Sequence, residues 1–168
     1  ILTPLRQHMH ADEHEQYTIC SLYCDTPDWQ LIRTSLEKPY YKEKLRVRSY
    51  GTPTPDGRVF VELKKKVGGI VYKRRIALPA ARADAFLRGE VSVPGQIARE
   101  ISWFQRMYGA QPRVLIAYDR TAFAGVTEPG LRVTFDISRS RRVTAARRCS
   151  VTTGFSWSSR PPTPARSG

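Results

Sequence analysis

Charged and apolar residues alternate along several stretches of this chain, and this alternation limits the possible folds more than any other feature. In residues 42–50, basic side chains at every second position share one face of a strand, while Leu45 and Val47 fall on the other face. A similar two-residue period runs through residues 58–67, 70–78, 114–123 and 131–137. Residues 17–24 are β-branched and aromatic and end at a turn signal, so the sequence predicts six strands in all.

Turn segments and three helices complete the predicted fold. Residues 51–57 and 68–69 are turn segments short enough for consecutive hairpins, so residues 42–78 predict an antiparallel meander. Helices are predicted at residues 27–37, 80–88 and 95–108, the last from an apolar repeat of 3.6 residues. We expect the charged, irregular residues 8–15 to form a solvated connection. The expected fold class is α+β, with these strand residues facing the helices: Leu45, Val47, Val61, Leu63, Val133 and Phe135.

The opposite face of the predicted sheet carries many basic residues. A single basic strand is ordinary for a sheet with one solvated face. Here, however, like charges would stand opposite each other on neighbouring strands, which destabilises a sheet unless an anion or acids lie among them. Alternation places only Glu62 and Asp136 on this face as acids. The pattern therefore favours a site for a multiply charged anion, which a curled or closed sheet would concentrate best.

Overall charge and composition point to one domain and an anionic partner. The 168 residues hold 28 Lys and Arg against 15 Asp and Glu, a formal net charge of +13. We predict a domain at residues 1–137 and a disordered tail at 138–168, rich in Arg, Ser and Pro, through which nucleic acid could bind. Three cysteines without metal spacing and no long apolar run predict a soluble, cytoplasmic protein with no membrane segment.

Six short runs of the sequence resemble, in order, the VTC domain of polyphosphate polymerases. They are YTICSLYCDT at 17–26, YKEKLRVRSYG at 41–51, VELKKK at 61–66, VYKRR at 71–75, IAYDRTAF at 116–123 and LRVTFD at 131–136. That domain belongs to the triphosphate tunnel, or CYTH-like, superfamily. The resemblance covers roughly residues 1–137 and implies an antiparallel β-barrel with a basic tunnel inside and helices outside.

The resemblance also implies residue roles and a reaction. Its phosphate-binding positions correspond to Arg46, Arg48, Lys64, Lys73, Arg120 and Arg132, and Lys44 and Arg75 share their strand parity. The implied reaction transfers the terminal phosphoryl group of ATP to polyphosphate with a divalent metal, Mn²⁺ or Mg²⁺. Glu62 and Asp136 are the candidate metal ligands, with salt bridges to neighbouring bases as the alternative. We assign no catalytic residue.

The sequence departs from the family pattern near both ends. The family's opening strand and its later strand with the metal-binding Glu are not recognisable, so we expect an incomplete barrel and little or no phosphoryl transfer by this chain. Three functions stay open: a polyphosphate polymerase-type enzyme, a non-catalytic module that binds polyphosphate, and a nucleic-acid-binding module. The expected partners are ATP, triphosphate or polyphosphate.

Overall fold

A computed structural model describes residues 8–128 and 130–138 of the chain, and within them six strands form one sheet. Every neighbouring pair is antiparallel, in the order β4-β3-β2-β1-β5-β6. The strands are β1 (Met9–Asp25), β2 (Tyr41–Tyr50), β3 (Arg58–Val67), β4 (Ile70–Pro79), β5 (Gln111–Gly125) and β6 (Arg132–Ser138). The predicted strands and the predicted meander of β2, β3 and β4 are confirmed. The predicted tail spans residues 138–168; Ser138 is the last residue of β6, and residues 139–168 lie outside the described residues.

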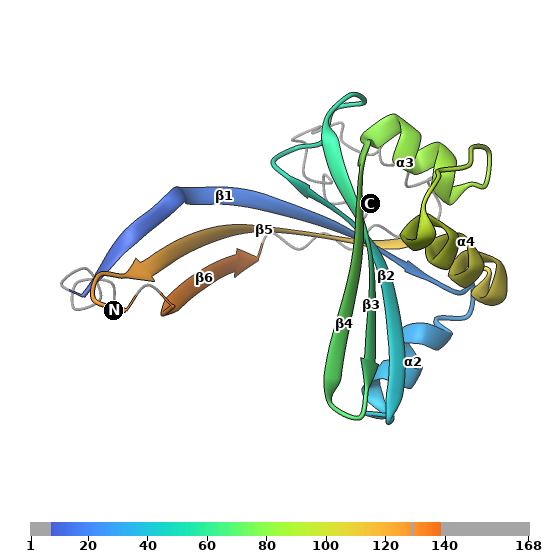
Figure 1. The fold of residues 1–168 in the computed structure, drawn as a ribbon, viewed down its shortest axis with the longest axis horizontal. Helices are drawn as coiled ribbons and strands as arrows, with labels where there is room; N and C mark the ends of the chain where they lie inside the picture. The colour runs from blue at the N-terminus through green and yellow to red at the C-terminus, as the bar shows by residue number, and fades with distance from the viewer. Residues whose placement is uncertain (1–7, 129, 139–168) are drawn as a thin grey trace, which may run out of the picture.

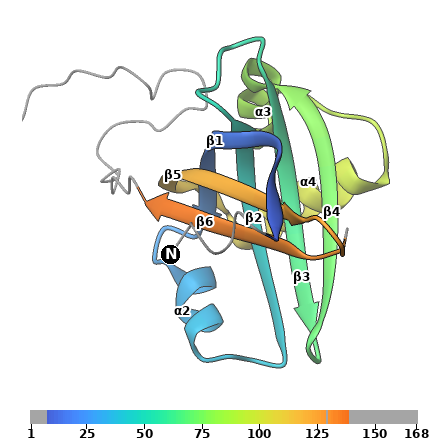
Figure 2. The same ribbon diagram turned by 90° about the vertical axis from the view of Figure 1, so that its left-hand side faces the viewer.

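The sheet curls into a half-barrel (Figures 1 and 2), and β1 and β5 are much longer than the strands beside them. β1 pairs with β2 only over Ile19–Cys24, and its earlier part continues with β5 and β6 as an arm. A register shift between Ala11 and Gln16 marks an irregularity in this arm, and such bulges bend strands and increase their twist. The arm leaves the body of the molecule on the side opposite α3 and α4 and passes in front of β2 and β3 (Figures 1 and 2). Within the described residues β4 and β6 are the two edges, so the expected tunnel is an open concave face.

The beginning of β1 corrects one prediction. Residues 8–15 were expected to form a solvated connection, yet from Met9 onward they belong to the strand. Met9, His10 and Ala11 pair with Gly125, Ala124 and Phe123 of β5. The cross-strand pairing outweighs the weak strand preference of these polar residues, as often happens because strand propensity depends on context.

The three helices of the described residues are α2 (Gln30–Leu36), α3 (Ala80–Leu87) and α4 (Gln96–Tyr108), close to the predicted segments. α3 and α4 cover the convex face of the sheet (Figure 1). There Ile101 and Phe104 of α4 and Phe86 of α3 join buried strand residues that include Leu45 and Leu63 in one core. Each such side chain contributes about 1.5–3 kcal/mol by its burial. No helix of the described part is long and apolar enough to cross a membrane.

Val133 and Phe135 do not face helices, which corrects a second prediction. Both lie on β6 in the arm, away from α3 and α4 (Figure 1). The ring of Phe135 instead packs edge-on against Phe123 of β5, with 6.1 Å between ring centroids. The alternation correctly predicts which side of the strand is apolar. It cannot show how far along the sheet the helices extend.

Candidate anion-binding face

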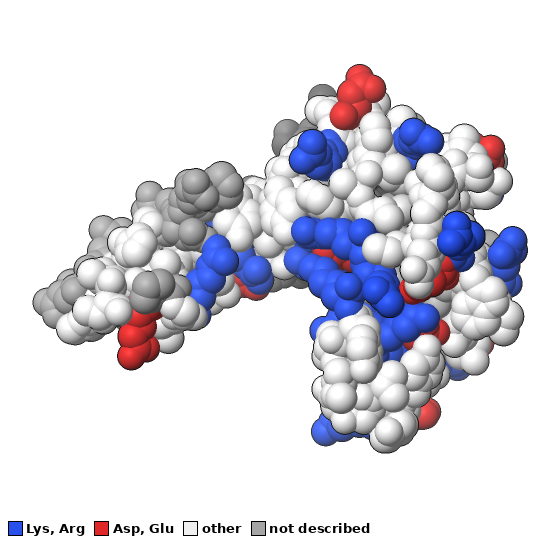
Figure 3. Space-filling model, in the orientation of Figure 1, with Lys and Arg blue, Asp and Glu red and all other residues white. Residues whose placement is uncertain are grey.

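Basic side chains from three adjacent strands stand in rows across the concave face. Lys44 of β2 lies opposite Lys64 of β3, which lies opposite Lys73 of β4. The next row holds Arg46, Glu62 and Arg75. In all, the alternate positions of β2–β4 supply one carboxylate, that of Glu62, and eight bases: Lys42, Lys44, Arg46, Arg48, Lys64, Lys66, Lys73 and Arg75. We call these eight the concave-face bases, and Lys and Arg atoms gather over this part of the sheet (Figure 3).

Glu62 is the buried counter-ion of this face. Its side chain is 1% exposed, and it contacts three of the concave-face bases. Arg46 Nε donates to Oε2 at 2.7 Å, while Arg75 Nε at 2.9 Å and Lys73 Nζ at 3.1 Å approach Oε1. Burial disfavours the charged form of Glu62, but the hydrogen bonds from Arg46 and Lys73 outweigh it and hold the pKa below its ordinary value.

Neutral hydroxyl groups orient the arginines. Arg46 Nη1 donates to the Tyr23 hydroxyl at 3.1 Å, and Arg75 Nη2 donates to the Tyr50 hydroxyl at 3.3 Å. Arg48 donates through Nε to Ser21 Oγ at 3.3 Å and through Nη2 to the Tyr118 hydroxyl at 3.5 Å. These partners fix the guanidinium groups without neutralising their charge.

The hydroxyl partners are site residues that the sequence reasoning missed. A usable signal was present in residues 17–24, since Ser21 and Tyr23 alternate with the apolar Leu22 and Cys24. The same parity argument that was applied to the basic strands places these two hydroxyls on the basic face.

The pKa values of two side chains at opposite ends of β2 reflect the positive potential of this face. The pKa of Lys42 is lowered by desolvation and by repulsion from other lysines, with Lys44, Lys66 and Lys64 among them. The pKa of Tyr50 is also lowered, because a hydrogen bond from Arg75 and the nearby positive charge outweigh the opposing effect of burial. Both shifts favour the form with less positive or more negative charge, as expected where cations accumulate.

The bases on the two faces of the sheet differ in the ion pairs that they form. On the convex face, Lys65 lies 3.2 Å from Glu43, and Arg74 lies 3.5 Å from Glu100. On the concave face, Lys44 and Lys64 form no ion pair with any carboxylate of the described residues. Lys44 and Lys64 are therefore left without a counter-charge, which costs stability unless an anion binds there.

Arg120 and Arg132, the two predicted site residues on the arm, lie at different distances from this face. Arg120 of β5 holds both oxygens of Asp136, at 2.7 and 2.8 Å, and its guanidinium lies 5.4 Å from the Tyr118 ring. Because Tyr118 also accepts a hydrogen bond from Arg48, Arg120 borders the concave-face bases. Arg132 pairs with Ala124, four residues before Asp136 on β6, so it lies roughly 13 Å further along the arm.

The carboxylates of both candidate metal ligands form ion pairs with basic side chains. Glu62 and Asp136 lie in different parts of the sheet, and arginines or a lysine take up both oxygens of each carboxylate. The described residues contain no group of three or more His, Cys, Asp or Glu side chains suited to a metal. As placed, these two carboxylates do not fit a resident divalent metal.

Comparison with known proteins agrees with this geometry. Subunit 4 of the vacuolar transporter chaperone complex of Schizosaccharomyces pombe is 27% identical over 150 residues, which cover 75% of this chain and 21% of that protein. The chain therefore spans about a fifth of the length of this relative. A crystal structure from Bacillus halodurans, described as a candidate adenylate cyclase, superposes with a TM-score of 0.51 at 14% identity. The likeness covers 79% of this chain and 63% of that one, and it supports the predicted fold.

A family model decides the classification. The model of the VTC domain matches residues 1–158, which is most of the chain and extends past the predicted domain end at residue 137. The rows of bases on a curled antiparallel sheet are what the resemblance led us to expect of such a domain. The chain belongs to the VTC domain family.

Proposed function

We propose that the concave face binds the phosphate chain of ATP, triphosphate or polyphosphate. The observation that carries this proposal is the row of Lys44, Lys64 and Lys73, of which only Lys73 contacts a carboxylate. Beside it lies the row of Arg46 and Arg75 around Glu62. Guanidinium groups bind phosphate oxygens in pairs, and ammonium groups add point charges, so the two rows suit an anion with many oxygens.

The extent of the face favours a chain of phosphates over a single phosphate. The lysine row crosses β2, β3 and β4, which is two strand spacings or roughly 10 Å. The second row runs parallel to it at the same strands. An extended anion can contact both rows at once, whereas one phosphate group cannot span them.

The family resemblance adds phosphoryl transfer from ATP to polyphosphate as the reaction of a domain of this kind, although we expect little or no transfer by this chain itself. Transfer of this kind depends mainly on positioning the phosphates and stabilising their negative charge, which arginines and lysines can supply. Dependence on Mn²⁺ or Mg²⁺ is expected from the family, although Glu62 and Asp136 are engaged by bases. For that reason the non-catalytic polyphosphate-binding module remains the second candidate. Cytoplasmic residence belongs to the same proposal and agrees with the free, buried thiols of Cys20 and Cys24.

Calorimetry with tripolyphosphate at fixed salt tests the binding proposal. Replacing Arg46 and Arg48 together by Ala should weaken binding at least 100-fold, because each lost hydrogen bond to a charged group is worth about 1.5–3 kcal/mol. The matched control replaces Arg82 and Arg99, exposed on α3 and α4, and removes the same charge. An equal loss in both double variants would show only a general charge effect and would contradict the assignment.

Activity and nucleic-acid binding are separated by two further measurements on the same protein. Incubation with ATP and Mn²⁺ should give little or no polyphosphate, and efficient polymer formation would establish the enzyme over the binding module. Competition between tripolyphosphate and a DNA duplex tests the third function. DNA binding that survives saturation with tripolyphosphate would assign nucleic acid to a surface other than the concave face.

A further inference from the structure

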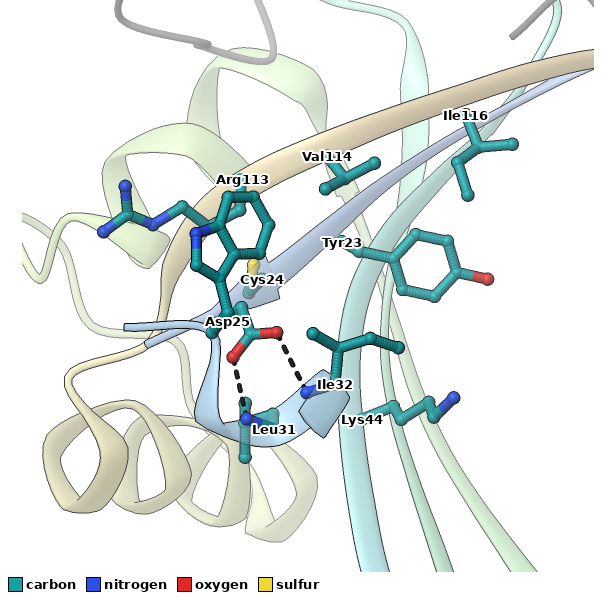
Figure 4. A pocket seen from close by; sticks show the side chains of 10 residues that line it. Tyr23, Cys24, Asp25, Leu31, Ile32, Lys44, Arg113, Val114 and Ile116 are labelled. Carbon is teal, nitrogen blue, oxygen red and sulfur yellow. Dashed lines mark hydrogen bonds between the residues drawn. The ribbon is translucent and has the colours of Figure 1, made fainter. Parts of the chain in front are cut away.

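A pocket of about 320 Å³ opens beside α2, next to the concave-face bases. Ligand pockets have volumes of roughly 300–1,000 Å³, so this one is large enough for a small organic group. Ile32 of α2 and Val114 and Ile116 of β5 give it apolar walls, while Tyr23 and Lys44 lie at its side toward β2 (Figure 4). None of the functions considered above uses these apolar walls.

Trp29 lines this pocket in a strained backbone conformation. Its φ of 65° and ψ of 29° lie in the left-handed region, which is unusual for a bulky residue. Hydrogen bonds on both sides hold it: Trp29 N donates to Thr26 O at 3.1 Å, and Asp25 accepts from the backbone of Leu31 and Ile32 at 2.9 and 3.1 Å. The indole nevertheless stays 38% exposed. Strain that leaves a large ring exposed in a pocket is a common mark of a binding site.

Arg113 adds an unpaired hydrogen-bond donor to the same pocket. Its guanidinium carbon lies 5.9 Å from the centroid of the Trp29 ring. Its Nε is buried and finds no hydrogen-bond partner among the described residues. A planar, uncharged ring could stack on the exposed face of the indole, and a nucleobase is such a ring.

The pocket is continuous with the concave-face bases. Lys44 lines the pocket and also begins the lysine row, and Tyr23 lines it while holding Arg46. Strand register places Val114, Tyr23, Arg46, Glu62 and Arg75 in one row across five strands. This row covers four strand spacings, roughly 19 Å along the curved sheet. The row therefore has the apolar, aromatic pocket at one end and the basic side chains at the other.

From this arrangement we propose that the Trp29 pocket binds the nucleoside of a nucleoside triphosphate, with the phosphate chain on the concave-face bases. The inference rests on the proposed phosphate binding and adds a specific role for the apolar pocket beside it. A nucleotide fits the charge pattern because its base is flat and uncharged while its phosphates carry the negative charge. Inorganic tripolyphosphate has no group for the pocket, so it serves as the matched probe.

The test compares ATP with tripolyphosphate in the Trp29→Ala variant by calorimetry. Stacking of one base on an aromatic side chain corresponds to about 5- to 150-fold in affinity, so ATP binding should weaken within that range. Tripolyphosphate binding should stay within about twofold, since the concave-face bases are untouched. Trp103→Ala is the control: this residue is 49% exposed on α4, on the helix side of the sheet, and its loss should affect neither ligand.

A fluorescence measurement keeps the proposal testable if Trp29→Ala does not fold. In the unchanged protein, ATP should quench indole emission and tripolyphosphate should not, and the Trp29→Phe variant should lose the quench while keeping most of the ATP affinity. Equal losses for both ligands in Trp29→Ala, or no loss for either, would overturn the nucleoside pocket. Failure of tripolyphosphate to bind the unchanged protein would instead overturn the proposed function on which the pocket rests.

Discussion

Replacement of Glu62 by Gln is the most informative single change, because it removes the counter-ion of the concave face and keeps the side-chain shape. Removing one partner of a buried ion pair usually costs about 3–5 kcal/mol. Here Arg46, Arg75 and Lys73 are 21%, 37% and 46% exposed, so water can solvate part of their charge. We therefore expect a loss of about 2–3 kcal/mol in the free energy of unfolding, or about 4–12 °C in Tm for a domain of this size.

The pH dependence of this loss identifies its cause. Because the pKa of Glu62 is lowered in the folded state, its carboxylate stabilises the fold at pH values above its ordinary pKa. That contribution is lost as the pH falls through the lowered pKa. The Tm difference between the unchanged protein and Glu62→Gln should therefore be constant from pH 7 to about 5 and shrink at lower pH.

Tripolyphosphate should partly replace the missing carboxylate. A ligand at 100 times its Kd stabilises the folded state by about 2.7 kcal/mol, which is comparable to the expected loss. Without Glu62, the bases also have no carboxylate that competes with phosphate. We expect tripolyphosphate to raise the Tm of the variant more than that of the unchanged protein.

Thermal unfolding in phosphate-free buffer, with and without tripolyphosphate, measures all three effects. Glu37→Gln, at an exposed position after α2, is the control with the same loss of charge and should change Tm very little. A Tm of Glu62→Gln equal to that of the unchanged protein at pH 7 would refute the reasoning. A difference that does not shrink at low pH would assign the effect to packing instead of charge.

Three further predictions use the same unfolding assay. Asp136→Asn should cost no more than about 1 kcal/mol, because the Asp136 side chain is 42% exposed, and a loss as large as that of Glu62→Gln would contradict this. Phe104→Ala should cost about 3–5 kcal/mol, since Phe104 is 0% exposed in the core under α4, and a loss below 1 kcal/mol would contradict the packing described. Lys64→Gln should raise Tm slightly in low salt without ligand, by relieving repulsion from Lys44 and Lys73, while weakening tripolyphosphate binding; a lower Tm would show that the lysine row is not under repulsion.

Strand alternation predicted five of the six strands and the side of β2 and β3 that carries the bases, while the β-branched and aromatic composition of residues 17–24 predicted the sixth. The period of two fixes side-chain parity, so the grouping of Arg46, Glu62 and Lys64 on one face follows from the sequence. Salt bridges at Glu62 and Asp136, the alternative to metal binding, are what the structure contains. The remaining roles of the predicted site residues stay predictions.

Other features depended on pairing that no local pattern reveals. The early part of β1 is polar and becomes a strand only because β5 extends beside it. The same long pairing carries Phe135 away from the helices. A helix was predicted from residue 27, but Trp29 has a left-handed conformation and α2 begins only at Gln30. Trp29 and Ile32 line a pocket.

The buried carboxylate of Glu62 also bears on which anions this face can distinguish. It already gives Arg46, Arg75 and Lys73 one negative charge at short range, so these bases attract a chloride ion or another singly charged anion less strongly than they would without it. An anion with several linked charges can engage Lys44 and Lys64 as well, which Glu62 does not reach. A single internal acid thus favours the binding of a phosphate chain over the binding of small, singly charged anions at this face.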